Sequence, residues 1–207
     1  MSQEHLASAQ RLRKAVHHLA QRIIQLEIKA EDLDVVAETI EKSTHDLQGE
    51  KVPRWWGRKS GNGETRSRSY RSRSLFQGEL HLFSPELVWD EYLGPDGEPG
   101  YQFRVKLSDL YEGPPNAVHG GYIAGLFDEL LGAIQSLDAG ATGYTAKLNI
   151  KYRSFTPINK DLRFVGWIVQ SSGRRIAVKG HCLDEDRICS EAEALFLRPK
   201  SKLEDNG

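Results

Sequence analysis

The feature that most constrains the fold is a long apolar run, residues 119–137, that predicts a helix and is followed by four strand-like segments. These segments span residues 144–155, 161–170, 175–183 and 188–197. Polar turns separate the last three, and apolar side chains alternate along Leu148, Ile150 and Tyr152. Because such an apolar helix must bury its surface, we expect a concave antiparallel meander to cover it. The order of elements therefore predicts an α+β domain.

Two further strands are predicted ahead of the helix, over residues 87–92 and 101–107, with a turn at 94–97 between them. The compact domain is expected to span residues 75–200, followed by a polar tail at 201–207.

The first 48 residues are predicted to form a helical N-terminal extension. Its apolar residues recur at spacings of four and three, which places a heptad-like stripe on one side of a helix: Leu12, Val16, Leu19, Ile23, Leu26, Ala30, Leu33, Ala37 and Ile40. The stripe fits one long helix or two helices that are broken near residues 29–32. It indicates an amphipathic surface that covers a sheet or pairs with a second copy.

Residues 49–74 are rich in Gly, Ser and Arg and predict a basic linker or long loop. Its RSRSYRSRS tract could contact phosphate or nucleic acid. A net charge of -1 gives no global attraction to nucleic acid, so we do not expect that partner. No apolar run reaches the ~18 residues of a membrane span. Two cysteines without metal-ligand spacing, and a start without a secretory signal, favour a cytoplasmic protein with no metal site.

A stripe of glycines is the unusual property of the predicted helix. On a helical wheel, Gly121, Gly125, Asp128 and Gly132 lie on one side, and apolar residues fill most of the remainder. Glycine destabilises a helix interior by about 1 kcal/mol relative to Ala, but it permits close approach by a backbone or a thin ligand. We therefore expect Asp128 to lie in a groove, buried among apolar side chains. Glu129 points about 100° away.

The start of this helix predicts an oxyanion-stabilising site. The first-turn N–H groups at His119, Gly120 and Gly121 have no acceptors within the helix and suit a polarised carbonyl oxygen. Gly121 and Asp128 are about 10 Å apart along the axis, so one helix cannot bring both to one carbonyl. Two antiparallel copies can, which predicts a homodimer with two shared sites.

The segments HGGYIAGLFDE and YTAKLNIKY resemble the hotdog-fold acyl-CoA thioesterases of the phenylacetic-acid-pathway and THEM-like type. The resemblance covers about residues 98–198. It implies a hotdog fold, in which an antiparallel sheet wraps a central helix, and a homodimer or dimer-of-dimers tetramer. It also implies hydrolysis of a fatty or aromatic acyl-CoA, with no cofactor beyond the coenzyme A of the substrate.

The resemblance also implies roles for individual residues. Asp128 activates water or attacks the thioester carbon directly, the Gly121 amide polarises the carbonyl, and Thr145 positions the water. His119 shapes the loop. Further substrate-binding or supporting positions are Asn116, Gly120, Glu129, Lys151, Arg163, Arg174 and Arg175. Arg174 and Arg175 are expected to hold the phosphates of CoA, and Glu129 is expected to be structural. Asn116 lies where relatives often have a small residue, and it either contacts the substrate or caps the turn.

Two other functions stay open at this point. One is a hotdog hydratase or dehydratase that acts on enoyl thioesters, which needs a His and an acid at one carbon pair. The other is a non-catalytic acyl-CoA-binding scaffold that uses the N-terminal helices for partners.

Overall fold

The computed structural model describes residues 3–50, 72–138 and 143–199. The chain divides into two compact units, residues 1–84 and 85–207. Most of the predicted basic linker and all of the predicted polar tail, residues 201–207, lie outside the described residues. No helix among the described residues is long and apolar enough to cross a membrane.

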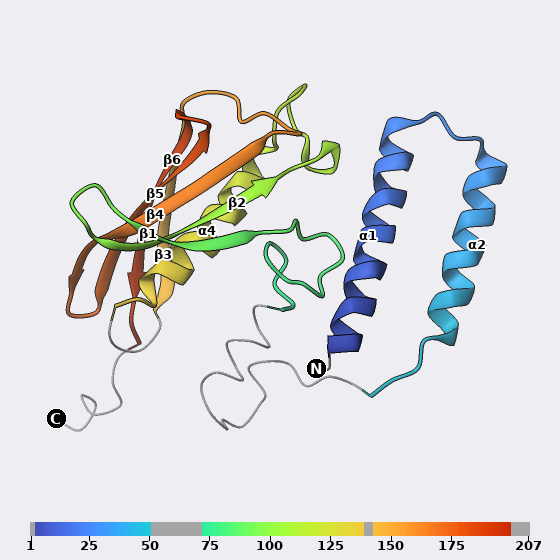
Figure 1. Cartoon of the computed structure of the whole chain (residues 1–207), viewed down its shortest axis with the longest axis horizontal. Coiled ribbons are helices and arrows are strands. Elements are labelled where there is room, and N and C mark those ends of the chain that lie inside the picture. Colours follow the sequence, from blue (N-terminus) through green and yellow to red (C-terminus); the bar gives the residue numbers. More distant parts are fainter. Residues whose placement is uncertain (1–2, 51–71, 139–142, 200–207) are drawn as a thin grey trace. The chain divides into compact units, whose positions relative to one another are not determined.

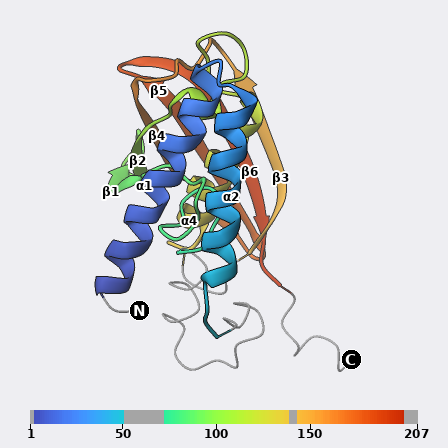
Figure 2. The same cartoon turned by 90° about the vertical axis from the view of Figure 1, so that its right-hand side faces the viewer.

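The first unit contains a helical hairpin. Helix α1 spans Gln3–Gln25 and α2 spans Ala30–Asp46, so the stripe belongs to two helices, broken at residues 26–29. They run side by side in both views (Figures 1 and 2). Of the α1 residues only Arg13 is buried, and of the α2 residues none is. Residues 72–84 follow as a tight coil, in which the Ser84 hydroxyl donates to the Gly78 carbonyl at 2.5 Å.

The second unit is a six-stranded antiparallel sheet with one long helix. The strands are β1 (Val88–Leu93), β2 (Pro99–Lys106), β3 (Tyr144–Tyr152), β4 (Asp161–Ser172), β5 (Arg175–Asp184) and β6 (Arg187–Leu197). Helix α4 spans Gly120–Gln135, and a short 3-10 turn, η2, spans Asp109–Tyr111. The strand order is β1-β2-β4-β5-β6-β3, so β3 and β1 are the edges. Figure 1 shows the curved sheet around α4. The predicted α+β architecture is confirmed.

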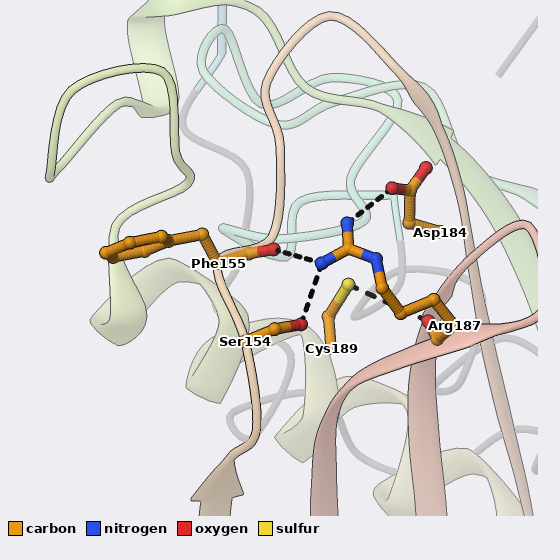
Figure 3. A network of polar contacts seen from close by, with 5 residues as sticks. All are labelled: Ser154, Phe155, Asp184, Arg187 and Cys189. Carbon is orange, nitrogen blue, oxygen red and sulfur yellow. Dashed lines mark hydrogen bonds and ion pairs between the residues drawn. The ribbon is translucent and has the colours of Figure 1, made fainter.

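The predicted helix and strands agree with the observed ones apart from their ends. The largest difference is at β3, which was expected to reach residue 155 and ends at Tyr152. The chain turns there because the amides of Arg153 and Ser154 both donate to the Cys189 carbonyl. Arg187 holds the same segment through the Ser154 hydroxyl at 2.9 Å and the Phe155 carbonyl, while it pairs with Asp184 (Figure 3).

The core lies between α4 and the sheet. The apolar face of α4 is fully buried, with exposures of 0–2% for Ile123, Leu126, Phe127, Leu130, Leu131 and Ile134. Phe127 meets the ring of Phe164 on β4 at 5.2 Å, and Phe164 stacks on Phe103 of β2 at 5.0 Å. The face of the sheet that carries Phe164 is therefore the face covered by α4.

Two paired glycines lie where α4 packs on this sheet. Gly166 of β4 is the register partner of Gly180 of β5. A Cβ at Gly166 would lie 2.7 Å from Ile134 Cδ1, and one at either glycine would lie 3.2 Å from Leu131 Cδ2. The absence of side chains at these two positions therefore lets α4 approach the sheet closely.

Candidate functional site

The start of α4 is fixed by His119, which is the N-cap residue. Its Nδ1 accepts a hydrogen bond from the Gly121 amide at 3.0 Å. The His119 amide in turn donates to the Tyr111 carbonyl, and the Val118 amide donates to the Thr156 carbonyl. Two chain segments therefore anchor the residues just before the helix. The Gly121 N–H, which we expected to face the substrate, is occupied by the imidazole in this chain.

The loop before the helix explains Asn116. Its φ is 60°, in the left-handed region, which Asn tolerates better than most residues. Its amide donates to Glu112 Oε1 at 2.5 Å, and its carbonyl accepts from the Ile158 amide. These contacts give Asn116 a role in forming the turn, while its exposed position leaves substrate contact a prediction.

Asp128 lies on the side of α4 that points away from the core. It is exposed in this chain, so the expectation that it is buried among apolar side chains is wrong. The reason is that the apolar residues of α4 pack against the sheet, whereas the glycine side, to which Asp128 belongs, points away from it. Nothing lies within 4 Å of a Cβ built at Gly132 on that side.

Thr145, the second residue of β3, contacts this acid directly. Its hydroxyl donates to Asp128 Oδ1 at 3.0 Å. The structure thus brings together two predicted site residues that are 17 positions apart. Within the described residues, no cationic side chain forms an ion pair with Asp128. The carboxylate is held by a neutral donor and stays open to solvent.

Tyr152, at the other end of β3, is a site residue to which the sequence analysis gave no role. Its hydroxyl donates to the Gly120 carbonyl at 2.8 Å, so it ties β3 to the first turn of α4. The ring lies against Gly120, where an added Cβ would be 3.2 Å from the hydroxyl oxygen. Tyr152 and Thr145 thus contact the open face of α4 at its first turn and at its middle.

The predicted phosphate-binding residues fall into two groups. Lys151 and Arg163 lie next to Tyr152 and Phe164 in their strands, so they point to the opposite face of the sheet from α4 and Asp128. Arg174 and Arg175 lie at the β4–β5 turn, near the C-terminal end of α4, where Ser171 donates to Asp138. The Arg174 Nε donates to the Arg198 carbonyl at 2.8 Å, and Arg175 is exposed.

The other reactive side chains of the second unit are less suited to a catalytic role than Asp128 and Thr145. Cys182 and Cys189 are fully buried, and burial raises the pKa of the Cys182 thiol, which disfavours a thiolate nucleophile. Burial and then the neighbouring Tyr111 raise the pKa of Tyr122, whose ring centroid is 4.4 Å from that of Tyr111. Glu129 is half-buried. No group of three His, Cys, Asp or Glu in the described ranges could hold a metal ion.

Comparison with known proteins identifies the fold. No family model matches this chain. A thioesterase superfamily protein of known crystal structure matches with a TM-score of 0.72 and 23% identity, over 91% of this chain and 94% of that one. Zebrafish thioesterase superfamily member 2 matches with a TM-score of 0.52 and 15% identity, over 65% of this chain and 97% of that one. The second unit therefore has the hotdog fold that these proteins share.

The first of these matches also extends beyond the hotdog unit. A match over 91% of 207 residues must include most of residues 1–84 as well as the second unit.

Proposed function

We propose that this chain hydrolyses the thioester bond of an acyl-CoA to a free acid and CoA, without a metal or other cofactor. The observation that carries the proposal is the hydrogen bond from Thr145 to Asp128 on the open side of α4. An oriented carboxylate beside a hydroxyl is suited to hold and deprotonate a water. The hotdog fold of thioesterase superfamily proteins and the HGG helix start support the same reaction.

The reaction balances with these groups. Asp128 takes a proton from water as the hydroxide adds to the carbonyl carbon, and the first-turn amide of α4 stabilises the oxyanion. The intermediate then expels the CoA sulfur, which leaves as a thiolate or takes up the proton. If Asp128 instead attacks directly, a mixed anhydride forms and water hydrolyses it. In either route, the carbonyl oxygen replaces His119 Nδ1 as the acceptor of the Gly121 N–H.

Two copies are needed in this proposal because of distance. Gly121 and Asp128 lie on the same open side of one helix, about 10 Å apart. Both residues are exposed in this chain, and β3 beside them is an edge strand that is exposed over most of its length. We infer that a second copy brings its own α4 antiparallel to the first, so that each site combines Asp128 of one copy with the Gly121 amide of the other.

The same arrangement accounts for Arg174 and Arg175. They lie near the C-terminal end of α4, about 24 Å from its start along the axis. Because Gly121 of one copy faces Asp128 of the other in this arrangement, the C-terminal end of one α4 lies about 10 Å beyond the first turn of the other. We propose that these arginines receive the CoA phosphates at a site shared with the second copy. Lys151 and Arg163, on the far face of the sheet, are weaker candidates.

The test is the rate of CoA release by an Asp128→Asn variant over a panel of acyl-CoAs. We expect turnover to fall by at least about 10²-fold, since general-base catalysis contributes that much. Asp186→Asn, at an exposed turn acid, is the matched control and should keep its activity. Unchanged hydrolysis in Asp128→Asn would refute the site. Hydration of an enoyl-CoA without CoA release would favour the hydratase, and tight binding without turnover would favour the scaffold.

A further inference from the structure

The N-terminal hairpin leaves most of its apolar side chains in solvent. Those more than a third exposed are Leu12, Ile23, Ile24, Leu26, Leu33, Val35, Ile40 and Leu47. Helix α2 has 17 residues, of which none is buried. A helix of this length is marginal in water and is normally stabilised by packing of its amphipathic face. A surface that covers this face is therefore required.

Some of these residues lie on one stripe of each helix, whereas Ile24 and Val35 lie on other sides, and Leu26 and Leu47 lie outside the helices. At 100° per residue, Leu12, Leu19 and Ile23 lie within about 40° of one another on α1. Leu33 and Ile40, seven residues apart, lie within about 20° of each other on α2, and such heptad spacing is that of helices that pack in bundles. Each stripe can therefore receive another helix along its length.

The two helices carry opposite charge. The α1 sequence contains Arg11, Arg13, Lys14 and Arg22 against the single acid Glu4. The α2 sequence contains six acids and one lysine. Arg11 and Arg22 form a basic row beside the stripe of α1, and Asp34 and Glu41 form an acidic row beside that of α2, whereas Glu31 and Glu38 lie nearly opposite the α2 stripe. Among the described residues, no ion pair joins α1 to α2.

We propose that this hairpin pairs with the same hairpin of a second copy, with α1 of each copy against α2 of the other. The two hairpins then form a four-helix bundle in which both stripes are covered. Every basic row faces an acidic row, and one two-fold contact satisfies both helices of both copies. An unrelated partner would need to be acidic against one helix and basic against the next, whereas a second copy is both.

The test uses two charge-reversed full-length chains and sedimentation velocity. One chain carries Arg11→Glu with Arg22→Glu, so both of its helices are acidic. The other carries Asp34→Lys with Glu41→Lys, so the row beside its α2 stripe is basic, like the row beside its α1 stripe. We expect each to self-associate about tenfold more weakly than the unmodified chain or worse, because attractive pairs become repulsive. An equimolar mixture should recover the lost association, since acidic rows then meet basic rows.

Mixing separates contact between copies from contact within one chain. A chain with all four changes should associate like the unmodified protein under either arrangement. If only that chain recovers, and the mixture does not, the helices pair within one chain and the proposal is wrong. Unchanged association in both reversed chains also overturns it, and would mean that the second unit or another protein covers the stripes. Lys14→Glu with Lys42→Glu, at positions nearly opposite the two stripes, is the control and should change nothing.

The readout is independent of the proposed thioesterase site. That site would add its own contact between copies, through α4 and β3 of the second unit, and this contact is the same in all the variants. The proposal depends only on the difference between each reversed chain and the unmodified chain. CoA release by these variants should remain measurable if the two contacts are separate.

Discussion

At the scale of single residues, the site depends on two hydroxyl groups of β3. Thr145 orients Asp128 through Oδ1, which leaves Oδ2 to accept a proton from water. Tyr152 holds the Gly120 carbonyl and so the first turn of α4. One residue thus acts on the acid and the other on the amides that we expect to bind the oxyanion. Their removal should have different consequences.

Replacement of Thr145 by Val should lower kcat for CoA release by about tenfold or more. A hydrogen bond to a charged group contributes about 1.5–3 kcal/mol, and the variant loses the donor that orients Asp128. KM should change little, because Thr145 contacts the acid and not the CoA moiety. Thr145→Ser keeps the hydroxyl and should retain most of the rate. Equal losses in the Val and Ser variants would show that the hydroxyl has no such role.

Replacement of Tyr152 by Phe removes a hydrogen bond and keeps the ring. We expect the free energy of unfolding to fall by only about 1 kcal/mol. The first turn of α4 also loses its hydrogen bond to β3. We therefore expect kcat to fall even though almost all of the protein stays folded. Urea unfolding and steady-state kinetics on the same preparation compare the two effects. A rate equal to that of the unmodified chain would restrict Tyr152 to a structural role.

The sequence predicted Asp128 and Thr145 but could not reveal Tyr152, for a geometric reason. Thr145 and Tyr152 are seven residues apart, so simple alternation places them on opposite faces of a strand. A register shift between Thr145 and Lys147 moves both to the face that α4 covers. The burial of Asp128 was misjudged for a related reason, since a helical wheel gives the sides of a helix but not what covers each side.

At the scale of elements, α4 and its sheet were predictable because their apolar patterns are long and regular. The order of strands and the seat of the helix were not, since both depend on pairing between distant segments. The two glycine sets on this unit illustrate the difference. Gly166 and Gly180 belong to the sheet and admit α4, whereas Gly132 belongs to α4 and faces away from the sheet.

Alanine substitutions at Gly180 and Gly132 should therefore have opposite effects on stability. At Gly180, a Cβ would lie 2.8 Å from the Val165 carbonyl oxygen and 3.2 Å from Leu131, so we expect a loss of about 1–3 kcal/mol. At Gly132 nothing lies within 4 Å, and replacing a helical Gly should add up to about 1 kcal/mol. Chemical unfolding at low protein concentration measures both.

Gly132→Ala also tests the proposed approach of two α4 helices. If Gly132 gives up stability so that a second copy can approach closely, the alanine variant should be more stable as a single chain but associate more weakly. Sedimentation at several concentrations reports the second effect. Stronger or unchanged association would argue against close contact at this position.

At the scale of the whole molecule, each of the two units contains a histidine that should make it sensitive to acid. Burial lowers the pKa of His17 in the first unit and of His181 in the second below 6.5; for His17, a backbone hydrogen bond with Leu82 opposes the shift and Arg13 adds to it. His181 lies edge-on to Trp167 at 5.1 Å; nearby Glu191 opposes the shift and Lys179 adds to it. In both cases the folded chain favours the neutral imidazole more than the unfolded chain does.

The sign of the pH dependence follows from this difference between the folded and unfolded states. Between the lowered pKa and 6.5, the unfolded chain binds more protons, so stability rises with pH. The contribution is complete above about pH 6.5 and is lost as the pH falls through the folded-state pKa. Glu191, whose pKa is lowered by Arg153, loses its contribution in a separate window below its usual 4.5.

We therefore expect the melting temperature of the full chain to fall between about pH 7.5 and about pH 5.5. In a His181→Gln variant the melting temperature of the second unit should depend less on pH, because Gln cannot be protonated in that range. In a His17→Gln variant the melting temperature of the first unit should depend less on pH. The fluorescence of Trp167, beside His181, gives a signal weighted toward the second unit. An unchanged slope of melting temperature against pH in His181→Gln would show that other groups cause the acid sensitivity.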